Sequence, residues 1–463
     1  MCLMFPRLAA LAMLCAAADA FALEPEPITG ELPWFVFRAQ DGGATDALVY
    51  ADTLREDWQS LDESLRPYAI LELPGPRTGI VGWGDRFNDV VNELHVAGIP
   101  TVVAITDSPQ TLYPIDQLRA IFDRFTTVRG VHVAGLRFDR YPRIASSEPA
   151  AVPAQVRWLA SVIDLAADYG RRVLIELDGL EWVHVAANTW NEPLLDAMRR
   201  HPGVVVPLTG QHGPHSIVAS STALGLWIEG AADQWGLASD SQWFNDARFI
   251  EPGEFGGDPD ALMPPSLYRA MILNGAMTGA TVYRFPDASD LWKGARATYW
   301  TESIAPTLRE ITKRGYIARK EFVVGKTRVA FRLAPATSVA EFEANLPDLD
   351  PIFHAGSLLH GAYGLEMPGQ VPELILNTGA FYWVPVLSPF AGGEALSQFD
   401  AIVNCGTATD ARDWRDRLIA HYAPDGHGSA FISRIGRGYF VLQSRENFYE
   451  EQPFTLDAVP APV

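Results

Sequence analysis

Short apolar runs and longer amphipathic stretches alternate along most of this chain. Eight of the runs have the length of buried strands: Trp34–Phe37, Ala69–Leu73, Thr101–Ile105, Gly130–Val133, Val173–Leu177, Val204–Leu208, Ala223–Ile228 and Ala280–Phe285. Between them apolar residues recur at helical spacing, and several of these stretches end on a glycine, as helix C-termini commonly do. Buried strands that alternate with amphipathic helices are typical of a parallel sheet covered on both faces.

The number of repeats selects among the parallel-sheet folds. Eight strand–helix units within roughly 250–300 residues match the size of a TIM barrel, in which the strands close into a ring. A doubly wound open sheet is the alternative, but no glycine-rich phosphate loop follows the first strand, which weakens it. We therefore predict an α/β fold, with a (β/α)₈ barrel over residues 33–318.

The pattern changes after the barrel, and residues 319–463 are predicted to form a smaller β-rich, sandwich-like domain. Three of its runs have the character of strands and hairpins: Phe322–Leu333, Leu374–Val386 and Gly428–Ser444. Gly436-Arg437-Gly438 is the expected turn of the last hairpin, and one helix near Asp413–Tyr422 interrupts the strands.

The N-terminus has the pattern of a secretory signal over residues 1–22, followed by a Pro- and Glu-rich linker over residues 23–32. Arg7 supplies the positive charge, Leu8–Ala18 the apolar segment, and Ala18-Asp19-Ala20 one of two A-x-A cleavage sites. No later stretch is apolar over the length of a membrane span. We expect a secreted or periplasmic protein.

Charge and composition narrow the class of partner. The formal net charge of -20 argues against nucleic acid, whose phosphates require clustered Lys and Arg, and against acidic polysaccharides. Neutral polysaccharides or oligosaccharides remain compatible with it, and 13 tryptophans suit the stacking of sugar rings, although tryptophans also fill large cores. No metal or cofactor is expected, because the histidines show no metal-ligand spacing and only Cys405 remains beyond the signal. The oligomeric state is left open.

The predicted strand ends are polar, and a barrel of this type carries its active site there. Glu72 and Arg284 are among these residues, and each acid can alternatively cap a helix or pair with an arginine. The carboxylates that we select as catalytic candidates are Glu229, Asp178, Glu176 and Asp139. The candidates for substrate binding are Trp182, Trp227, Trp235, Arg137, His212 and Asp287.

Two of the carboxylates are placed by simple geometry. Glu176 and Asp178 are two residues apart, so both point to one face of their strand, and burying two acids against helices is costly. The inside of the barrel is favoured for both. Glu229 ends the run Ala223–Ile228, read as strand seven, and a charge there fits only the mouth of the barrel. It is the strongest single candidate.

Four segments resemble one known family. Leu226–Asp240 (LWIEGAADQWGLASD) and Asn274–Tyr283 (NGAMTGATVY) resemble the barrel domain of glycoside hydrolase family 98. Gly379–Leu387 and Gly438–Asn447 are similar to the C-terminal β domain of that family. The resemblance implies an inverting endo-glycosidase that acts on complex glycans, such as blood-group-type chains or, in some members, xylan.

The chain departs from the expected family pattern at two strand ends. The resemblance implies a glutamic acid near the end of strand four, where this chain reads Gly135-Leu136-Arg137. Strand eight ends in Arg284-Phe285-Pro286-Asp287, again without glutamate. The first hypothesis is a secreted glycosidase with Glu229 and Asp178 as base, and Glu176 or Asp139 as acid. The alternatives are a glycan-binding protein of the same fold that has lost catalysis, and a structural protein of the cell envelope.

Overall fold

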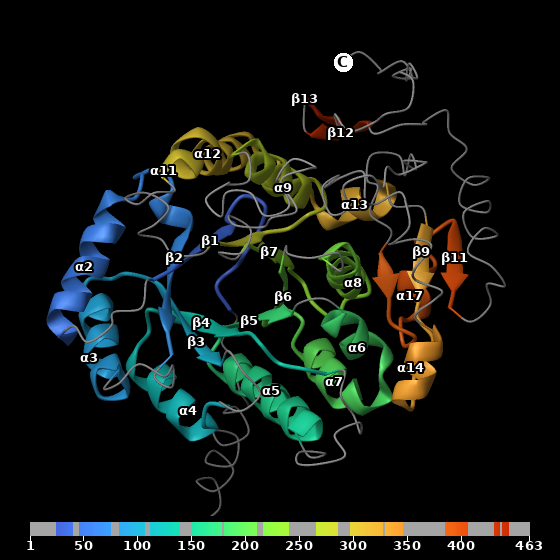
Figure 1. The fold of residues 1–463 in the computed structure, drawn as a ribbon, viewed down its shortest axis with the longest axis horizontal. Helices are drawn as coiled ribbons and strands as arrows, with labels where there is room; N and C mark the ends of the chain where they lie inside the picture. The colour runs from blue at the N-terminus through green and yellow to red at the C-terminus, as the bar shows by residue number, and fades with distance from the viewer. Residues whose placement is uncertain are drawn as a thin grey trace, which may run out of the picture.

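The structure is a computed structural model of the whole chain (Figure 1). The residues that it describes are 25–39, 46–75, 83–106, 112–138, 151–177, 180–210, 216–239, 265–285, 297–326, 329–345, 385–405, 430–435 and 438–443. No helix within these ranges combines the length and the apolar character that crossing a membrane requires.

Eight parallel strands close into a barrel in chain order, which confirms the predicted fold class. The strands are β1 Trp34–Arg38, β2 Ala69–Pro74, β3 Thr101–Thr106, β4 Val128–Val133, β5 Arg172–Leu177, β6 Val205–Gly210, β7 Gly236–Ala238 and β8 Val282–Phe285. Closure is direct, because β1 pairs with both β2 and β8.

Helices surround this ring (Figure 1). They are α2 Ala47–Ser60, α3 Trp83–Val96, α4 Ile115–Arg124, α5 Ala151–Asp168, α6 Glu181–Ala187, α7 Glu192–Arg200, α8 Ser216–Ile228, α9 Pro265–Met277, α11 Ala297–Tyr299 and α12 Ala305–Arg314. The short helices η1 Arg66–Tyr68 and η2 Thr189–Asn191 and the π-helical turn η5 Trp300–Ile304 lie between them.

Strand seven was predicted in the wrong place. The run Ala223–Ile228 belongs to helix α8, and β7 is only three residues long, Gly236–Ala238. The helix lies between the barrel and a second sheet, so it is apolar on every side and lacks the one-sided pattern that marks a surface helix. A short apolar run without periodicity cannot be told from a buried strand.

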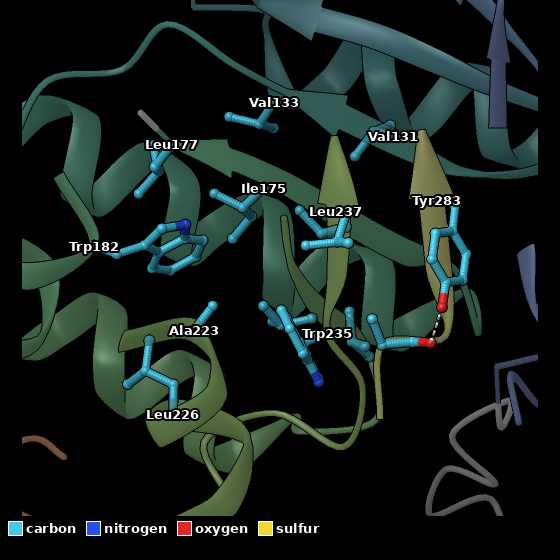
Figure 2. Packing of buried hydrophobic residues seen from close by; sticks show 14 of the residues in the cluster. Val131, Val133, Ile175, Leu177, Trp182, Ala223, Leu226, Trp235, Leu237 and Tyr283 are labelled. Carbon is cyan, nitrogen blue, oxygen red and sulfur yellow. Dashed lines mark hydrogen bonds between the residues drawn. The ribbon is translucent and has the colours of Figure 1, made fainter. Parts of the chain in front are cut away.

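The strands separate two cores. Alternate side chains fill the inside of the barrel: Trp34, Val36, Ile70, Val102, Leu174, Val206, Leu208, Ala238 and Val282, together with Ile28. The others point outward and pack under the helices, as Figure 2 shows for Ile175, Leu177 and Leu237 beside Trp182 and Trp235. Burying each large side chain of this kind stabilises the fold by about 1.5–3 kcal/mol.

The segment before β1, predicted as a linker, is partly built into the barrel. Ile28 is 1% exposed and belongs to the inner core. Arg172, at the first position of β5, donates from Nη2 to the backbone oxygen of Glu26 at 2.6 Å. The segment therefore covers the end of the barrel at which the strands begin.

A second sheet lies beside helices α6 and α8 (Figure 1). Its strands β9 Val329–Arg332, β10 Val386–Leu387 and β11 Ala401–Asn404 are parallel, in the order β10-β9-β11. Helices α13 Lys320–Lys326, α14 Val339–Asn345 and α17 Gly393–Leu396 accompany them. A Cβ atom at Gly225 of α8 would lie 1.8 Å from the backbone oxygen of Val386, so glycine permits this close contact.

The C-terminal predictions are met in part. The predicted strand Phe322–Leu333 is wrong in its first half, where helix α13 lies. The last predicted hairpin has its two strands, since β12 Ala430–Ile435 and β13 Gly438–Gln443 pair antiparallel with Ile435 opposite Gly438. The helix near Asp413–Tyr422 and most of Leu374–Val386 lie outside the described residues, and the sandwich-like domain remains a prediction.

Candidate active site

Four ionisable side chains meet inside the barrel, toward the carboxyl ends of its strands: Glu72 on β2, His132 on β4, Glu176 on β5 and Arg284 on β8. Arg284 donates to both oxygens of Glu72, from Nε at 2.7 Å and from Nη2 at 2.8 Å. Its Nη1 lies 3.0 Å from Oε2 of Glu176. His132 lies between the carboxylates, with Nε2 3.1 Å from Glu176 Oε2 and Nδ1 3.4 Å from Glu72 Oε1. We call these four residues the central network.

Strand alternation places these side chains in the barrel. Arg284 is in register with Val36, and Glu176 with Leu208. Residues in register on neighbouring strands point to the same face, and both apolar partners belong to the inner core. The prediction that Glu176 points into the barrel is therefore confirmed, although its catalytic role remains a prediction.

Charge pairing sets the protonation of the network. Burial raises the pKa of Glu72, but Arg284 and His132 outweigh it and bring that pKa well below its ordinary value of 4.5. Burial likewise raises the pKa of Glu176, and Arg284 and His132 bring it below 4.5. Burial lowers the pKa of His132, but the carboxylates raise it above 6.5. Both carboxylates are thus ionised at neutral pH.

One oxygen of the network has no donor among the residues that the structure describes. Both oxygens of Glu72 accept hydrogen bonds, and its side chain is 1% exposed. Glu176 uses only Oε2, and its side chain is 9% exposed. No described residue donates to its Oε1. An ionised carboxylate with one open oxygen can accept a proton from a water molecule or a sugar hydroxyl.

Hydrogen bonds hold the residues that follow β4. Glu181, the first residue of α6, accepts a hydrogen bond from Phe138 N at 2.6 Å and one from Arg137 Nη1 at 3.2 Å. The side chain of Gln155 on α5 accepts from Arg137 N at 3.1 Å. Arg137 is 52% exposed, as a substrate-binding residue requires, and that role remains a prediction.

The three tryptophans predicted to bind sugar do not lie at the mouth of the barrel. Trp182 and Trp235 are fully buried outside the strands and donate from Nε1 to the backbone oxygens of Leu208 and Thr278. Trp227 on α8 is 4% exposed and donates to the Asp233 oxygen. Their indole rings are packed in the core between the strands and the helices. A sugar cannot stack on them there, because they are buried.

Glu229 also lies elsewhere than predicted. It directly follows helix α8, which runs back toward the start of the strands, and nearby Asp233 N donates to Pro202 O, just before β6, at 2.8 Å. Its oxygens accept from Arg199 Nη2 at 3.1 Å, Ser388 Oγ at 2.8 Å and Ser388 N at 2.9 Å. Burial raises its pKa, against the opposing effect of Ser388 and Arg199. The placement at a strand-seven mouth is wrong, and Glu229 instead joins the barrel to the second sheet.

We expect the substitution Glu229→Ala to lower the free energy of unfolding by about 1–3 kcal/mol, because it leaves the buried backbone N–H of Ser388 without its acceptor and removes the ion pair with half-buried Arg199. Turnover should not change, since the residue lies at the far end of the barrel. Urea denaturation and a reducing-end assay measure the two quantities, with exposed Glu302→Ala as control. Lost turnover at full stability would contradict this assignment.

Four predicted site residues lie outside the described part of the chain: Asp139, Asp178, His212 and Asp287. His132 was not among the predicted site residues. The available signal was a polar side chain at an inward-pointing position of an otherwise apolar strand. It noted Glu72 and Arg284 at strand ends but did not connect them. Among the described residues, no cluster of three or more His, Cys, Asp or Glu side chains could hold a metal ion.

Solved structures share this barrel fold. The catalytic module of a family 98 glycoside hydrolase from Streptococcus pneumoniae TIGR4, in its native form, matches with a TM-score of 0.69 and 18% identity. The alignment covers 92% of this chain and 74% of that one. The same module in complex with the H-disaccharide blood group antigen matches at 0.67 and 19%, with the same coverage. Its complex with the LewisY pentasaccharide matches at 0.67 and 18%, again with 92% and 74% covered.

The family itself is shown by sequence. The model of the glycosyl hydrolase family 98 matches residues 26–315, more than half of the chain. The chain belongs to glycoside hydrolase family 98, which confirms the predicted family and the predicted enzyme class. Among proteins with curated descriptions, none matches it in sequence.

Proposed function

We propose that this protein is an exported, endo-acting glycoside hydrolase that cleaves a complex neutral glycan with inversion, and that Glu176 is its general base. The observation that carries the proposal is an ionised Glu176 inside the barrel, held through Oε2 by His132 and Arg284, whose Oε1 accepts from no described residue. Glu72, His132 and Arg284 hold that carboxylate and keep it ionised, so they act as positioning residues.

The reaction needs a base and an acid on opposite sides of the sugar. Glu176 would take a proton from water while the water oxygen attacks the anomeric carbon, and an acid would protonate the departing glycosidic oxygen. Asp139 and Asp178 are the proposed acids. Asp139 directly follows the segment that Glu181 and Gln155 hold. Inversion calls for carboxyl groups roughly 6.5–9.5 Å apart, which leaves room for the water.

The substrate class is proposed from the family and the charge. The structurally similar module from S. pneumoniae is named in complexes with the H-disaccharide and the LewisY pentasaccharide. We propose blood-group-type, galactose-containing oligosaccharides as the first substrates, with xylan as the second. The net charge of -20 favours neutral glycans. The N-terminal pattern supports export to the medium or the periplasm.

A reducing-end assay tests the proposal. The mature protein is incubated with LewisY pentasaccharide, longer blood-group-type glycans, xylan and galactan, with Glu176→Gln as control. We expect new reducing ends, internal cleavage by product size, and by NMR an anomer inverted from the substrate. Binding without product in the wild type would instead support the glycan-binding protein that has lost catalysis. Product of retained configuration would contradict the proposed water attack.

A further inference from the structure

Arg38 is an exposed cation at the mouth of the barrel. It is the last residue of β1, in register with Glu72, and Ala39 N donates to Glu72 O at 2.8 Å. Val36, two residues earlier, faces inward beside Arg284. Alternation therefore points Arg38 toward the barrel axis, level with Glu72 and about 6.6 Å along β1 from Val36, the partner of Arg284.

Arg38 makes no hydrogen bond or ion pair with any described residue, in contrast to its charged neighbours. Glu72, the acid in register with Arg38, is bound through both of its oxygens to Arg284 instead. The chain has 56 acidic and 36 basic residues, so acids are plentiful as surface partners for an arginine. Within the described part of the chain, Arg38 is thus an exposed arginine that points into the barrel mouth without a charged partner, where a bound molecule could reach it.

The mouth beside Arg38 is lined by short side chains. Ala104 on β3 is in register with inward-pointing His132 and keeps part of its surface exposed, and so does Ala134 after β4. These positions lie between the strand of Arg38 and the strand of Glu176. At these two positions no large side chain stands between Arg38 and Glu176.

We propose that Arg38 is a substrate-binding residue whose guanidinium donates hydrogen bonds to a pair of neighbouring hydroxyl oxygens on the sugar next to the reaction centre. The inference rests on the proposed function and adds one contact to the same site. The planar fork of an arginine carries five donors and can serve two adjacent oxygens at once. The residue binds the glycan and takes no part in proton transfer.

Binding is measured by calorimetry in the Glu176→Gln background, with LewisY pentasaccharide, xylohexaose and a sulfated galactan oligosaccharide as probes. We expect Arg38→Met to raise the Kd for a neutral probe about 10- to 100-fold, and Arg38→Lys to raise it less. Arg314→Met, at the end of α12 and 63% exposed, is the matched control and should bind like the parent. With the wild-type Glu176, Arg38→Met should raise KM and keep kcat, as loss of uniform binding does.

The outcomes separate the two proposals. An unchanged Kd and KM in Arg38→Met overturns the assignment of Arg38, whether or not the wild type hydrolyses glycans. A raised Kd in a protein that gives no product supports Arg38 and overturns the hydrolase proposal. Loss of binding to the sulfated probe alone assigns an anion to Arg38 and overturns the hydroxyl contact. Failure of every probe to bind the parent overturns both.

Discussion

The substitution Glu176→Gln should lower kcat by about 10²- to 10⁴-fold, the usual contribution of a general base, with little change in KM. Glutamine has almost the same shape, and its carbonyl oxygen can accept the hydrogen bonds from Arg284 and His132 that Oε2 now receives. The amide group then occupies the open position, where it cannot take a proton from water. Initial rates on the best glycan of the panel provide the measurement.

The pH profile distinguishes a base from a residue that only supports the fold. The pKa of Glu176 lies below 4.5, so the acid limb of kcat/KM in the wild type should lie below that pH, where the carboxylate becomes protonated. The residual activity of Glu176→Gln should lack this acid limb. The exposed Glu302→Gln is the matched control and should keep both the rate and the limb. A Glu176→Gln variant with wild-type kcat would remove the base from the proposed mechanism.

The barrel could be predicted from the sequence because its strands carry a local signal. Six-residue runs such as Ala69–Pro74 and Arg172–Leu177 are buried along their whole length, and glycines mark the ends of the helices between them. The prediction fails where an element is buried by residues that are distant in the sequence. Helix α8 is apolar on all sides because a second sheet covers it, and β7 has only three residues.

The site was predictable residue by residue but not as an arrangement. The alternation of side chains along β5 predicts that Glu176 points into the barrel, and its contact with Arg284 confirms this. Nothing in the sequence pairs Glu72 with Arg284, which lie 212 positions apart and meet only because β1 brings β2 and β8 together. Glu229 was misplaced because the run Ala223–Ile228 was taken for strand seven. The tryptophans were selected as an aromatic residue type, although the sequence did not show whether their side chains point into the barrel or toward the helices.

Replacing Arg284 by methionine should lower the free energy of unfolding by about 3–5 kcal/mol at neutral pH, because it leaves two buried carboxylates facing each other without their main counter-charge. Arg284→Lys should recover only part of this loss, since one ammonium group cannot donate to both oxygens of Glu72 and to Glu176 together. Urea denaturation followed by tryptophan fluorescence gives the measurement. A loss below about 1 kcal/mol, the range of exposed ion pairs, would show that the network is not buried as described.

The contribution of the two glutamates to the pH dependence of stability should change sign in the Arg284→Met variant. In the wild type both glutamate pKa values lie below 4.5, so their contribution to stability is complete above that pH and is lost as pH falls through the lowered values. The raised pKa of His132 adds stability that is present below 6.5 and lost as pH rises through its folded value. Without Arg284, burial should raise the pKa of both carboxyl groups above 4.5, so the folded variant binds more protons than the unfolded chain. Its stability should then increase as pH falls from 7 to 5. The added substitution Glu72→Gln removes one of the two charges, so the double variant should be more stable at pH 7 and should show a smaller increase.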